Sequence, residues 1–419
     1  MWWHFILRGY VVLMGFLLIN VQQCWAAGFY ISEVGTPHSL GSAGVANPTN
    51  RWGADSAWSN PAGMTGLEDD QIFFGAQVVF PLVEFDSSIA EAGGDDGGNA
   101  GEIAPIPSFF YVKKLSDRSR FGFSVTAPLG GGLDYGSDFV GRYQTTRAEL
   151  AGVALSPSFG YKVTDRFSVG TGVSIIYTRF EQDIAINQAS ANAADGIMKL
   201  EKVDGFAYQP FFSMNYQFSD RLLLGIVYRA EAGTDISGDV KFENLVIIPT
   251  PSAHKIDAEW DNPQWLEAGL KYKLTDTINL ILSGGWQDWS AFSQNQLAFS
   301  GGAINGAVTL DRNFKDTWHA GIAMSSVKPG KSGYSLGFSY DSSPVEDEDR
   351  TFDLPFDEIY KFSGSYGIVG SKKIDYSVGG TLYMIGDAAI DQTAQGVRTK
   401  GEFDTNLLFF IGGTLRYKF

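Results

Sequence analysis

Side chains that could perform catalytic or metal chemistry are few and scattered in this sequence. The four histidines lie far apart: His4, His38, His254 and His319. None stands at the spacing of a metal-binding motif or of a Ser-His-Asp triad. The run Gly130-Gly131-Gly132 lacks the Gly-Lys-Ser/Thr that completes a phosphate-binding loop. We therefore expect no catalytic site, no metal site and no cofactor, and we predict that the protein is not an enzyme.

Carboxylates gather in two stretches that we expect to be loops. The first contains Asp95, Asp96, Asn99 and Glu102, and the second runs from 346 to 349. Clustered carboxylates bind hard cations such as Ca²⁺, but more often they are simply solvated loop residues. Over the whole chain, 47 Asp and Glu outnumber 31 Lys and Arg, which gives a net charge of −16. This balance argues against nucleic acid as a partner.

The first 26 residues have the features of a signal peptide for export. Arg8 supplies a positive charge, and the apolar run 11–21 is too short to span the ~30 Å hydrocarbon layer of a bilayer. Cys24 and Ala26 provide small residues for cleavage. A lipid anchor on Cys24 is the weaker interpretation, because two glutamines precede this only cysteine. We expect residues 1–26 to be removed and the mature protein to lack cysteine.

Large apolar residues alternate with small or polar residues along much of the chain. The segments 167–178, 334–340 and 374–384 follow this pattern, with serine, glycine and threonine at the alternate positions. A soluble β-sandwich would place its large residues inward and its lysines and glutamates outward. Small and polar residues inside, with large apolar residues outside, are typical of the wall of a membrane β-barrel.

Short and long connections alternate along the chain and give a count of the strands. Six short polar turns are expected near residues 116–118, 164–166, 219–221, 275–277, 329–331 and 371–373. Seven longer connections are expected near residues 86–102, 136–146, 184–202, 236–256, 290–312, 342–356 and 386–402. This alternation predicts about 14 antiparallel strands, with both termini at the end of the short turns. The predicted fold class is therefore all-β, a transmembrane antiparallel β-barrel over residues 68–419.

A barrel of this size would leak unless something filled its lumen. Residues 27–67 precede the first expected strand and are rich in Gly, Ala, Ser and Asn, so we predict that they form an N-terminal luminal hatch. Asn60 is expected to cap a short helical turn that begins at Pro61 and continues with Ala62. The other interpretation of Asn60-Pro61 is a turn in a disordered periplasmic tail.

The chain also carries short motifs in a recognisable order. Those before the barrel are Ala27-Gly28-Phe29, Leu40-Gly41-Ser42-Ala43-Gly44, Asp55-Ser56-Ala57 and Asn60-Pro61-Ala62. Those within it are Ile103-Ala104-Pro105, Trp286, Trp289-Ser290-Ala291-Phe292, Phe314-Lys315-Asp316, Asp341-Ser342-Ser343-Pro344-Val345 and Leu354-Pro355. Together they resemble the FadL family of outer-membrane long-chain fatty-acid transporters, which also includes importers of toluene-like aromatics. The resemblance implies a 14-stranded barrel in the bacterial outer membrane, plugged by the hatch.

The resemblance implies passive transport of hydrophobic small molecules, above all long-chain fatty acids, by movement of the hatch when a ligand binds. An aromatic hydrocarbon importer and a general diffusion porin are the alternatives. Besides the hydrophobic ligand, we expect outer-membrane lipids and lipopolysaccharide as partners, and a monomeric protein.

Roles for single residues follow from the same resemblance. Phe29 would lie against the bound ligand, beside the new N-terminus. The basic residues that hold a ligand's polar head in the best-known members have no clear match, because Ile184 and Leu310 stand near their expected places. Arg312 and Lys315, near the fifth long connection, are our candidates for contacts with a carboxylate head group.

The third expected strand contains a break in its pattern. After Thr126 the sequence reads Ala127-Pro128-Leu129-Gly130 and continues with two more glycines. Proline cannot donate to a β-ladder and consecutive glycines permit bulges, so continuous pairing is not expected there. A hydrophobic ligand gains nothing by entering water, which favours a lateral exit through a gap in the wall. The stretch aligns with the kinked third strand of FadL-like barrels, and we predict an inward kink that opens a side window. The alternative is that the strand simply ends there.

Overall fold

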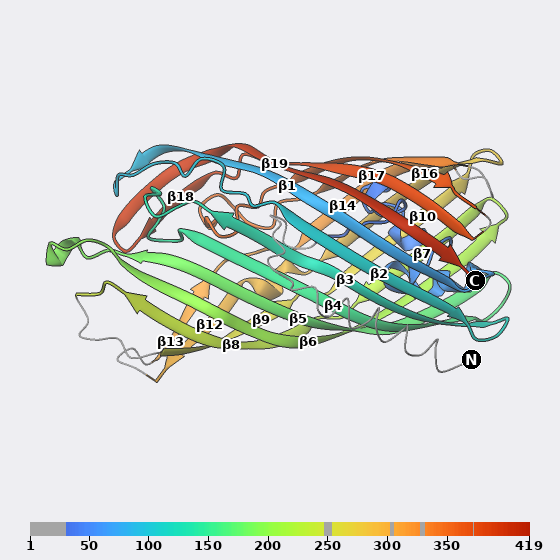
Figure 1. The fold of residues 1–419 in the computed structure, drawn as a ribbon, viewed down its shortest axis with the longest axis horizontal. Helices are drawn as coiled ribbons and strands as arrows, with labels where there is room; N and C mark the ends of the chain where they lie inside the picture. The colour runs from blue at the N-terminus through green and yellow to red at the C-terminus, as the bar shows by residue number, and fades with distance from the viewer. Residues whose placement is uncertain (1–30, 247–253, 302–305, 327–331, 372) are drawn as a thin grey trace.

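The structure is a computed structural model that describes residues 31–246, 254–301, 306–326, 332–371 and 373–419. The β-segments form one antiparallel sheet that closes on itself, because β1 pairs with both β2 and β19 (Figure 1). The described helices are short and none of them has the length and apolar character needed to cross a membrane.

The wall has fourteen strands, as the alternation of connections predicts. Five wall strands are each divided into two β-segments: β7/β8, β9/β10, β11/β12, β13/β14 and β17/β18. The bounds of the first nine segments are β1 (Gln71–Ala90), β2 (Ala104–Lys114), β3 (Ser119–Asp134), β4 (Arg147–Lys162), β5 (Phe167–Ile186), β6 (Gly196–Ser219), β7 (Leu222–Arg229), β8 (Ala232–Glu243) and β9 (His254–Asn262). The others are β10 (Trp265–Lys273), β11 (Ile278–Gln287), β12 (Gln294–Ser300), β13 (Gly306–Asp311), β14 (Thr317–Ser326), β15 (Gly333–Asp341), β16 (Ile359–Val369), β17 (Ile374–Ile385), β18 (Ile390–Ala394) and β19 (Val397–Lys418).

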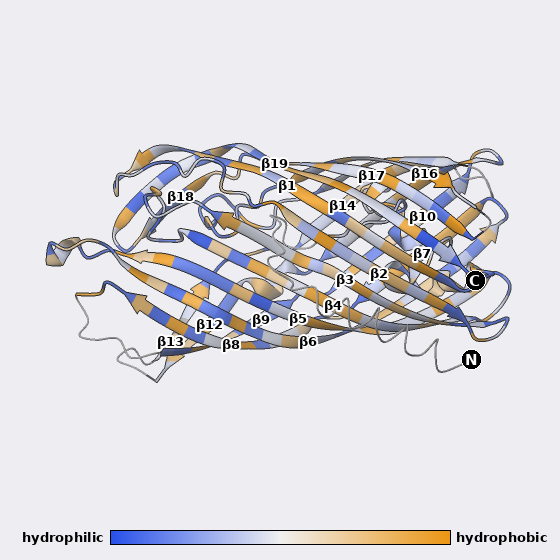
Figure 2. Cartoon of the chain, viewed as in Figure 1, coloured by the Kyte–Doolittle hydropathy of each residue, from blue (hydrophilic) through white to orange (hydrophobic). Residues whose placement is uncertain are grey.

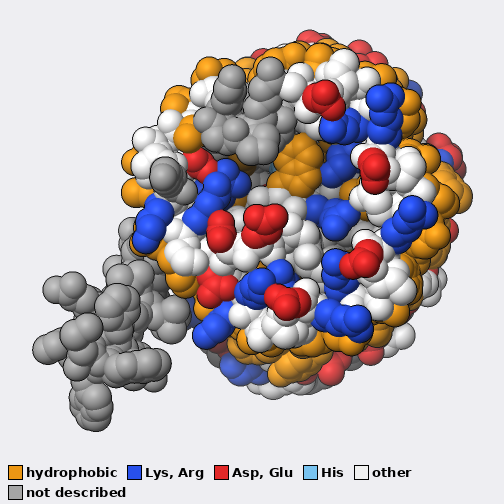
Figure 3. Space-filling view, turned by 90° about the vertical axis from the view of Figure 1, so that its right-hand side faces the viewer, with side chains coloured by type: hydrophobic (Ala, Val, Ile, Leu, Met, Phe, Trp, Pro, Cys, Tyr) orange, Lys and Arg blue, Asp and Glu red, His pale blue; other side chains and the backbone are white. Residues whose placement is uncertain are grey.

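The short turns lie at the end of the barrel that carries the C-terminus (Figure 1). Connections at 115–118, 163–166, 220–221 and 274–277 coincide with expected turns, whereas the turn expected near 329–331 falls entirely outside the described residues. Three of these turns repeat one ion pair between a lysine and an aspartate three residues later: Lys114–Asp117, Lys162–Asp165 and Lys273–Asp276. In Figure 3, which looks onto this end, charged side chains surround the rim and apolar ones cover the outer wall.

The long connections are shorter than the sequence suggests. The expected connection 236–256 contains most of β8 and the start of β9, and 290–312 contains β12 and β13. The registers of β8 with β9 and of β7 with β10 are continuous, so the strands extend beyond the apolar belt. Outside the membrane a strand no longer needs apolar residues on its outer face, which is why the alternation expected of a wall is lost there.

The two faces of the wall differ as predicted. On β16, Tyr360, Phe362, Tyr366 and Ile368 are exposed, and the alternating positions include Lys361, Ser363 and Ser365, which are less exposed. Across the sheet, apolar positions alternate with polar ones along each strand (Figure 2). Large apolar side chains outside and small ones inside match a wall that faces lipid on one side.

Residues 31–67, which we call the N-terminal segment, lie inside the barrel. They form three 3₁₀ helices and one helical turn: η1 (Leu40–Ser42), η2 (Asn47–Thr49), α2 (Ser56–Ser59) and η3 (Pro61–Gly66). Nearly all of the segment is buried, and its helices contact the strands β2–β7, β10 and β14–β17. Contacts with so many strands mean that the segment fills the lumen near the end that carries the short turns (Figure 1).

Glycines of the wall allow the N-terminal segment to lie this close. A Cβ at Gly225 of β7 would lie 1.8 Å from the carbonyl oxygen of Pro48. A Cβ at Gly170 of β5 would lie 2.3 Å from the backbone nitrogen of Ala62. These distances are far too short for any side chain at the two positions. The small residues predicted on the inner face of the wall therefore also make room for the N-terminal segment.

Candidate functional site

Asn60 has the geometry expected of an N-cap. Its Oδ1 accepts a hydrogen bond from the backbone N–H of Gly63 at 3.3 Å, and Pro61 is the first residue of η3. Its Nδ2 lies 2.9 Å from the amide oxygen of Asn215 on β6 and also donates to the carbonyl of Pro48. Asn60 is fully buried, so one side chain joins η3, η2 and the wall.

Buried charges bind the N-terminal segment to the wall at two more places. Glu33 lies 3.6 Å from the ammonium group of Lys361 on β16, and it accepts a hydrogen bond from the hydroxyl group of Tyr383 on β17. Arg229 at the end of β7 donates to the carbonyl of Trp58 and lies 5.0 Å from the centre of its ring. Buried charges persist only when they are paired, so these contacts fix the position of the segment.

The pairing of β2 with β3 is interrupted at the predicted kink, and we call this break in the hydrogen-bonded wall the β2–β3 opening. The two strands pair from Lys114–Arg120 up to Phe109–Val125, and beyond that point β3 no longer pairs with β2 but stays paired with β4. The register with β4 shifts between Thr126 and Leu129, so β3 is kinked but does not end there. Strand β2 continues to Ala104 while paired with β1.

The N-terminal segment reaches this β2–β3 opening. The backbone N–H of Ile31 donates to the carbonyl oxygen of Pro128 at 2.7 Å. A bridge between Gly101 and Leu133 joins the two sides again farther out. The opening is therefore a bounded gap, and the segment and the kink are in direct contact.

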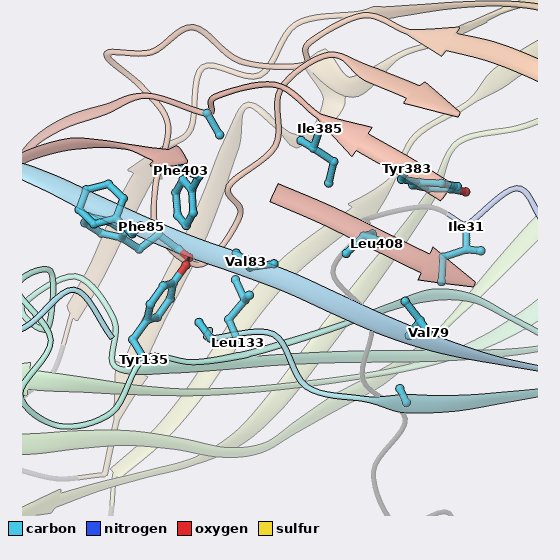
Figure 4. Close-up of a cluster of buried hydrophobic side chains, with 14 of the residues drawn as sticks. Ile31, Val79, Val83, Phe85, Leu133, Tyr135, Tyr383, Ile385, Phe403 and Leu408 are labelled. Atoms are coloured by element: carbon cyan, nitrogen blue, oxygen red, sulfur yellow. Dashed lines mark hydrogen bonds between the residues drawn. The ribbon is translucent and has the colours of Figure 1, made fainter. Parts of the chain in front are cut away.

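A buried hydrophobic cluster that includes Ile31 extends from the N-terminal segment along the inside of β1 and β19 (Figure 4). It joins side chains of β1 and β19, such as Val79, Val83 and Leu408, with Tyr135 from the connection that follows β3. Phe85 contributes an aromatic ring to the same cluster. Protein side chains thus pack inside the barrel at the level of the N-terminal segment and also farther along β1 and β19.

A small apolar cavity lies beside the kink. Its lining comes from β3, β4, β5, β9 and the two connections that follow β13 and β15: Gly130, Gly131, Gly132, Leu133, Ala148, Leu150, Phe180, Trp260, Arg312, Asp353, Leu354, Pro355 and Phe356. Most of these side chains are apolar or aromatic, which suits a hydrophobic molecule with few polar contacts. Gly130, which was predicted to lie near the kink, is part of β3 and also lines this cavity.

Arg312 and Asp353 form a buried ion pair in the wall of the cavity. The distance from Nη2 of Arg312 to Oδ2 of Asp353 is 2.8 Å, and both side chains are less than a tenth exposed. Burial alone would raise the pKa of the Asp353 carboxyl group, but the charge and hydrogen bonds of Arg312, with a hydrogen bond from Thr351, lower its pKa below the usual value. The pair is therefore charged at neutral pH.

The two candidate head-group residues lie in different surroundings. Arg312 lines the cavity, but Lys315 is exposed and pairs with Glu346 on the surface. Lys315 is thus not brought to the cavity. Phe29 lies outside the described residues, so its expected contact with a ligand stays a prediction.

A second cavity lies on the other side of Phe356, which lines both cavities. Its aromatic lining includes Trp58 of the N-terminal segment and Trp265 of β10, and its polar lining includes Glu267 and Lys361. Among the described residues no group of His, Cys, Asp and Glu could hold a metal ion.

Sequence reasoning missed Asp353. The stretch Phe352-Asp353-Leu354-Pro355-Phe356 contains one carboxylate among apolar residues, and that contrast was the available signal. A single charge in an apolar stretch must find a partner if it is buried. Neither its burial nor its partner, 41 residues away along the chain, could be read from spacing.

Comparisons with known proteins agree with this architecture. Residues 17–419 match the family model described as outer membrane protein transport protein (OMPP1/FadL/TodX). A long-chain fatty acid transport protein of Escherichia coli K12 is 21% identical, over 87% of this chain and 89% of that protein. Outer membrane protein P1 of Haemophilus influenzae is 19% identical, over 86% of this chain and 89% of that protein.

Solved structures share the fold. A Pseudomonas aeruginosa FadL homologue has a TM-score of 0.84 and 19% identity, and covers 94% of this chain and 100% of its own. The toluene transporter TodX of Pseudomonas putida has a TM-score of 0.69 and 16% identity, and covers 88% of this chain and 94% of its own. The chain therefore belongs to the OMPP1/FadL/TodX family of bacterial outer-membrane transport proteins, which are transport channels and not enzymes.

Proposed function

We propose that the protein carries hydrophobic small molecules, above all long-chain fatty acids, passively across the outer membrane. A ligand enters from the side of the long connections and occupies the apolar cavity beside β3. Its binding moves the N-terminal segment, which acts as a hatch, and the ligand leaves sideways through the β2–β3 opening. Signal peptide residues 1–26 are removed on export, and the mature protein acts as a monomer among outer-membrane lipids and lipopolysaccharide.

This proposal rests on one observation: three features that transport would need lie next to one another along β3. The apolar cavity, the β2–β3 opening and Ile31 of the N-terminal segment meet at the stretch from Pro128 to Gly132. A hydrophobic ligand that passes sideways remains in apolar surroundings throughout, whereas a path into the periplasm would expose it to water. The cavity is linked to the hatch through β3, because Gly130 lines the cavity and Pro128, two residues earlier, accepts the hydrogen bond from Ile31.

An aromatic hydrocarbon importer is the second candidate. The cavity lining is rich in aromatic side chains such as Phe180 and Trp260, and TodX, named as a toluene transporter, shares the fold. Fatty acids are favoured because the cavity also contains a cation, Arg312, which a hydrocarbon would not need. A general diffusion porin is disfavoured by the filled lumen.

Two measurements test the proposal together. The intact protein in a planar bilayer should pass little ion current, while cells that rely on it should take up a long-chain fatty acid. A large, steady current through the intact protein would instead indicate a porin. Phe29→Ala should weaken ligand binding, because an aromatic ring beside the ligand supplies apolar contact area. Toluene uptake without fatty-acid uptake would favour the second candidate.

A further inference from the structure

The Arg312–Asp353 pair has the form of a carboxylate bound in a receptor site. Arg312 directs Nη2 at one oxygen of Asp353 at 2.8 Å and Nη1 at the other at 3.5 Å. Nε donates to Oδ1 of Asn295 at 3.1 Å, and the guanidinium group lies 5.6 Å from the ring centre of Phe292. The guanidinium group is thus held in place beside Asn295 and Phe292, and its fork faces a carboxylate that the protein itself supplies.

Local structure explains why Arg312 can serve as a fixed receptor. It stands at the break between β13 and β14, where its backbone N–H donates to the carbonyl of Ser293 at 2.7 Å. The next residue, Asn313, has a φ of 50°, a left-handed conformation that asparagine tolerates. The chain turns there, and the arginine side chain is directed into the wall of the cavity.

The carboxylate comes from a short piece of chain that also closes the cavity. Residues 353–355, which we call the Asp353 flap, line the cavity together with Phe356. The flap is anchored at both ends. The hydroxyl group of Tyr135 donates to the carbonyl of Phe352 at 2.9 Å, and Arg350 donates to the carbonyl of Phe356 at 2.7 Å. Within the flap, the contacts with Arg312 and with Asn406 hold its inward position.

We propose that Asp353 occupies the place of a ligand carboxylate, and that an incoming fatty acid displaces it from Arg312 and moves the flap off the cavity. This inference rests on the proposed function and adds a selection step to it. The alkyl chain lies in the apolar cavity, and the head group takes over the fork of Arg312. Asp353 then turns toward solvent, where its charge is hydrated.

The energetics favour exchange over simple opening. Breaking a buried ion pair leaves an uncompensated charge in apolar surroundings, which is strongly unfavourable. Exchanging one carboxylate for another keeps Arg312 paired, and the hydration of the released Asp353 offsets the loss of hydration of the ligand's carboxylate. A methyl ester or an aromatic hydrocarbon offers no charge in return, so it leaves the flap in place. The pair thus admits acids in preference to neutral molecules of the same length.

The test compares laurate with methyl laurate, both brominated on the chain, by quenching of tryptophan fluorescence of the full protein in lipid nanodiscs. The native protein should bind the acid more tightly than the ester. Asp353→Asn removes the internal competitor, so affinity for the acid should rise about tenfold, and by a larger factor than affinity for the ester. The double variant Arg312→Met/Asp353→Leu replaces the pair by apolar side chains and should bind both molecules equally.

Lys315→Met is the matched control, because Lys315 is a nearby cation that lies on the surface. It should leave the ratio of acid to ester affinity unchanged. Hydrogen exchange adds a second readout: laurate should speed exchange in the peptide around Leu354, whose N–H donates to Thr351, and methyl laurate should not. Equal affinity of the native protein for both molecules, or no gain for the acid in Asp353→Asn, would overturn the exchange. If neither molecule binds, the proposed function falls with it.

Discussion

At the scale of single residues, Asn60 is the side chain whose loss should be easiest to detect. Asn60→Ala removes the cap of η3 and leaves the Pro48 carbonyl and the Asn215 amide without this partner in a buried site. Such a loss costs about 1–3 kcal/mol. We expect a looser N-terminal segment, seen as a rise in the frequency of short current openings in a planar bilayer. An unchanged current trace together with unchanged ligand uptake would make Asn60 a bystander.

His38 should make the N-terminal segment sensitive to acid. Burial, together with the positive charges of Lys271 and Arg416, lowers the pKa of His38 from 6.5 to about 3. The unfolded segment therefore binds more protons than the folded one between these two values, so stability falls as pH drops below about 6.5. Leakage current should rise over this range, and His38→Gln should flatten the dependence. A slope identical in the two proteins would exclude His38 as its cause.

At the scale of elements, β3 gives a test of the lateral exit. A Cβ at Gly130 meets nothing closer than the Leu150 carbonyl oxygen, at 3.8 Å, so Gly130→Leu should fold while its side chain fills the space beside the opening. Fatty-acid uptake should fall at least tenfold, while resistance to heat in gel electrophoresis stays native. Gly284→Leu on β11 is the control, because its nearest neighbour is also a distant carbonyl, at 3.5 Å. Full uptake by Gly130→Leu would contradict a lateral exit at this place.

The strands and the kink could be predicted from the sequence where their formation depends only on residues within the same strand. Alternation of apolar and polar residues determines the wall, and Pro128 with the glycines after it marks the kink, because these effects act within one strand. The divided strands and their extensions were not predictable, since pairing outside the membrane needs no apolar face. The site was least predictable: the partnership of Arg312 and Asp353 depends on how two distant connections pack.

At the scale of the whole molecule, we expect the wall of the barrel to fold without the N-terminal segment that lies inside it. The hydrogen bonds of the wall join neighbouring strands and form a closed ring from β1 to β19, so they do not require the N-terminal segment. The segment, in turn, is held by contacts such as Glu33 with Lys361 and Arg229 with Trp58. Without the segment these two wall cations would face a water-filled lumen and be hydrated, which removes the cost of burying them.

Deletion of residues 31–67 behind an intact export signal should therefore give a folded, heat-resistant barrel that leaks. Its single-channel current should be large and steady, because an empty lumen of this strand number has room for water and ions. In this deleted protein, fatty acids would cross through the lumen itself and no longer need the β2–β3 opening. Their uptake should therefore become insensitive to Gly130→Leu. The full-length protein, prepared in the same way, is the control. If the deleted protein folds but passes no more current than the control, the segment is not what closes the lumen, and the residues beyond Ile31 in the cluster of Phe85 and Tyr135 would have to do so.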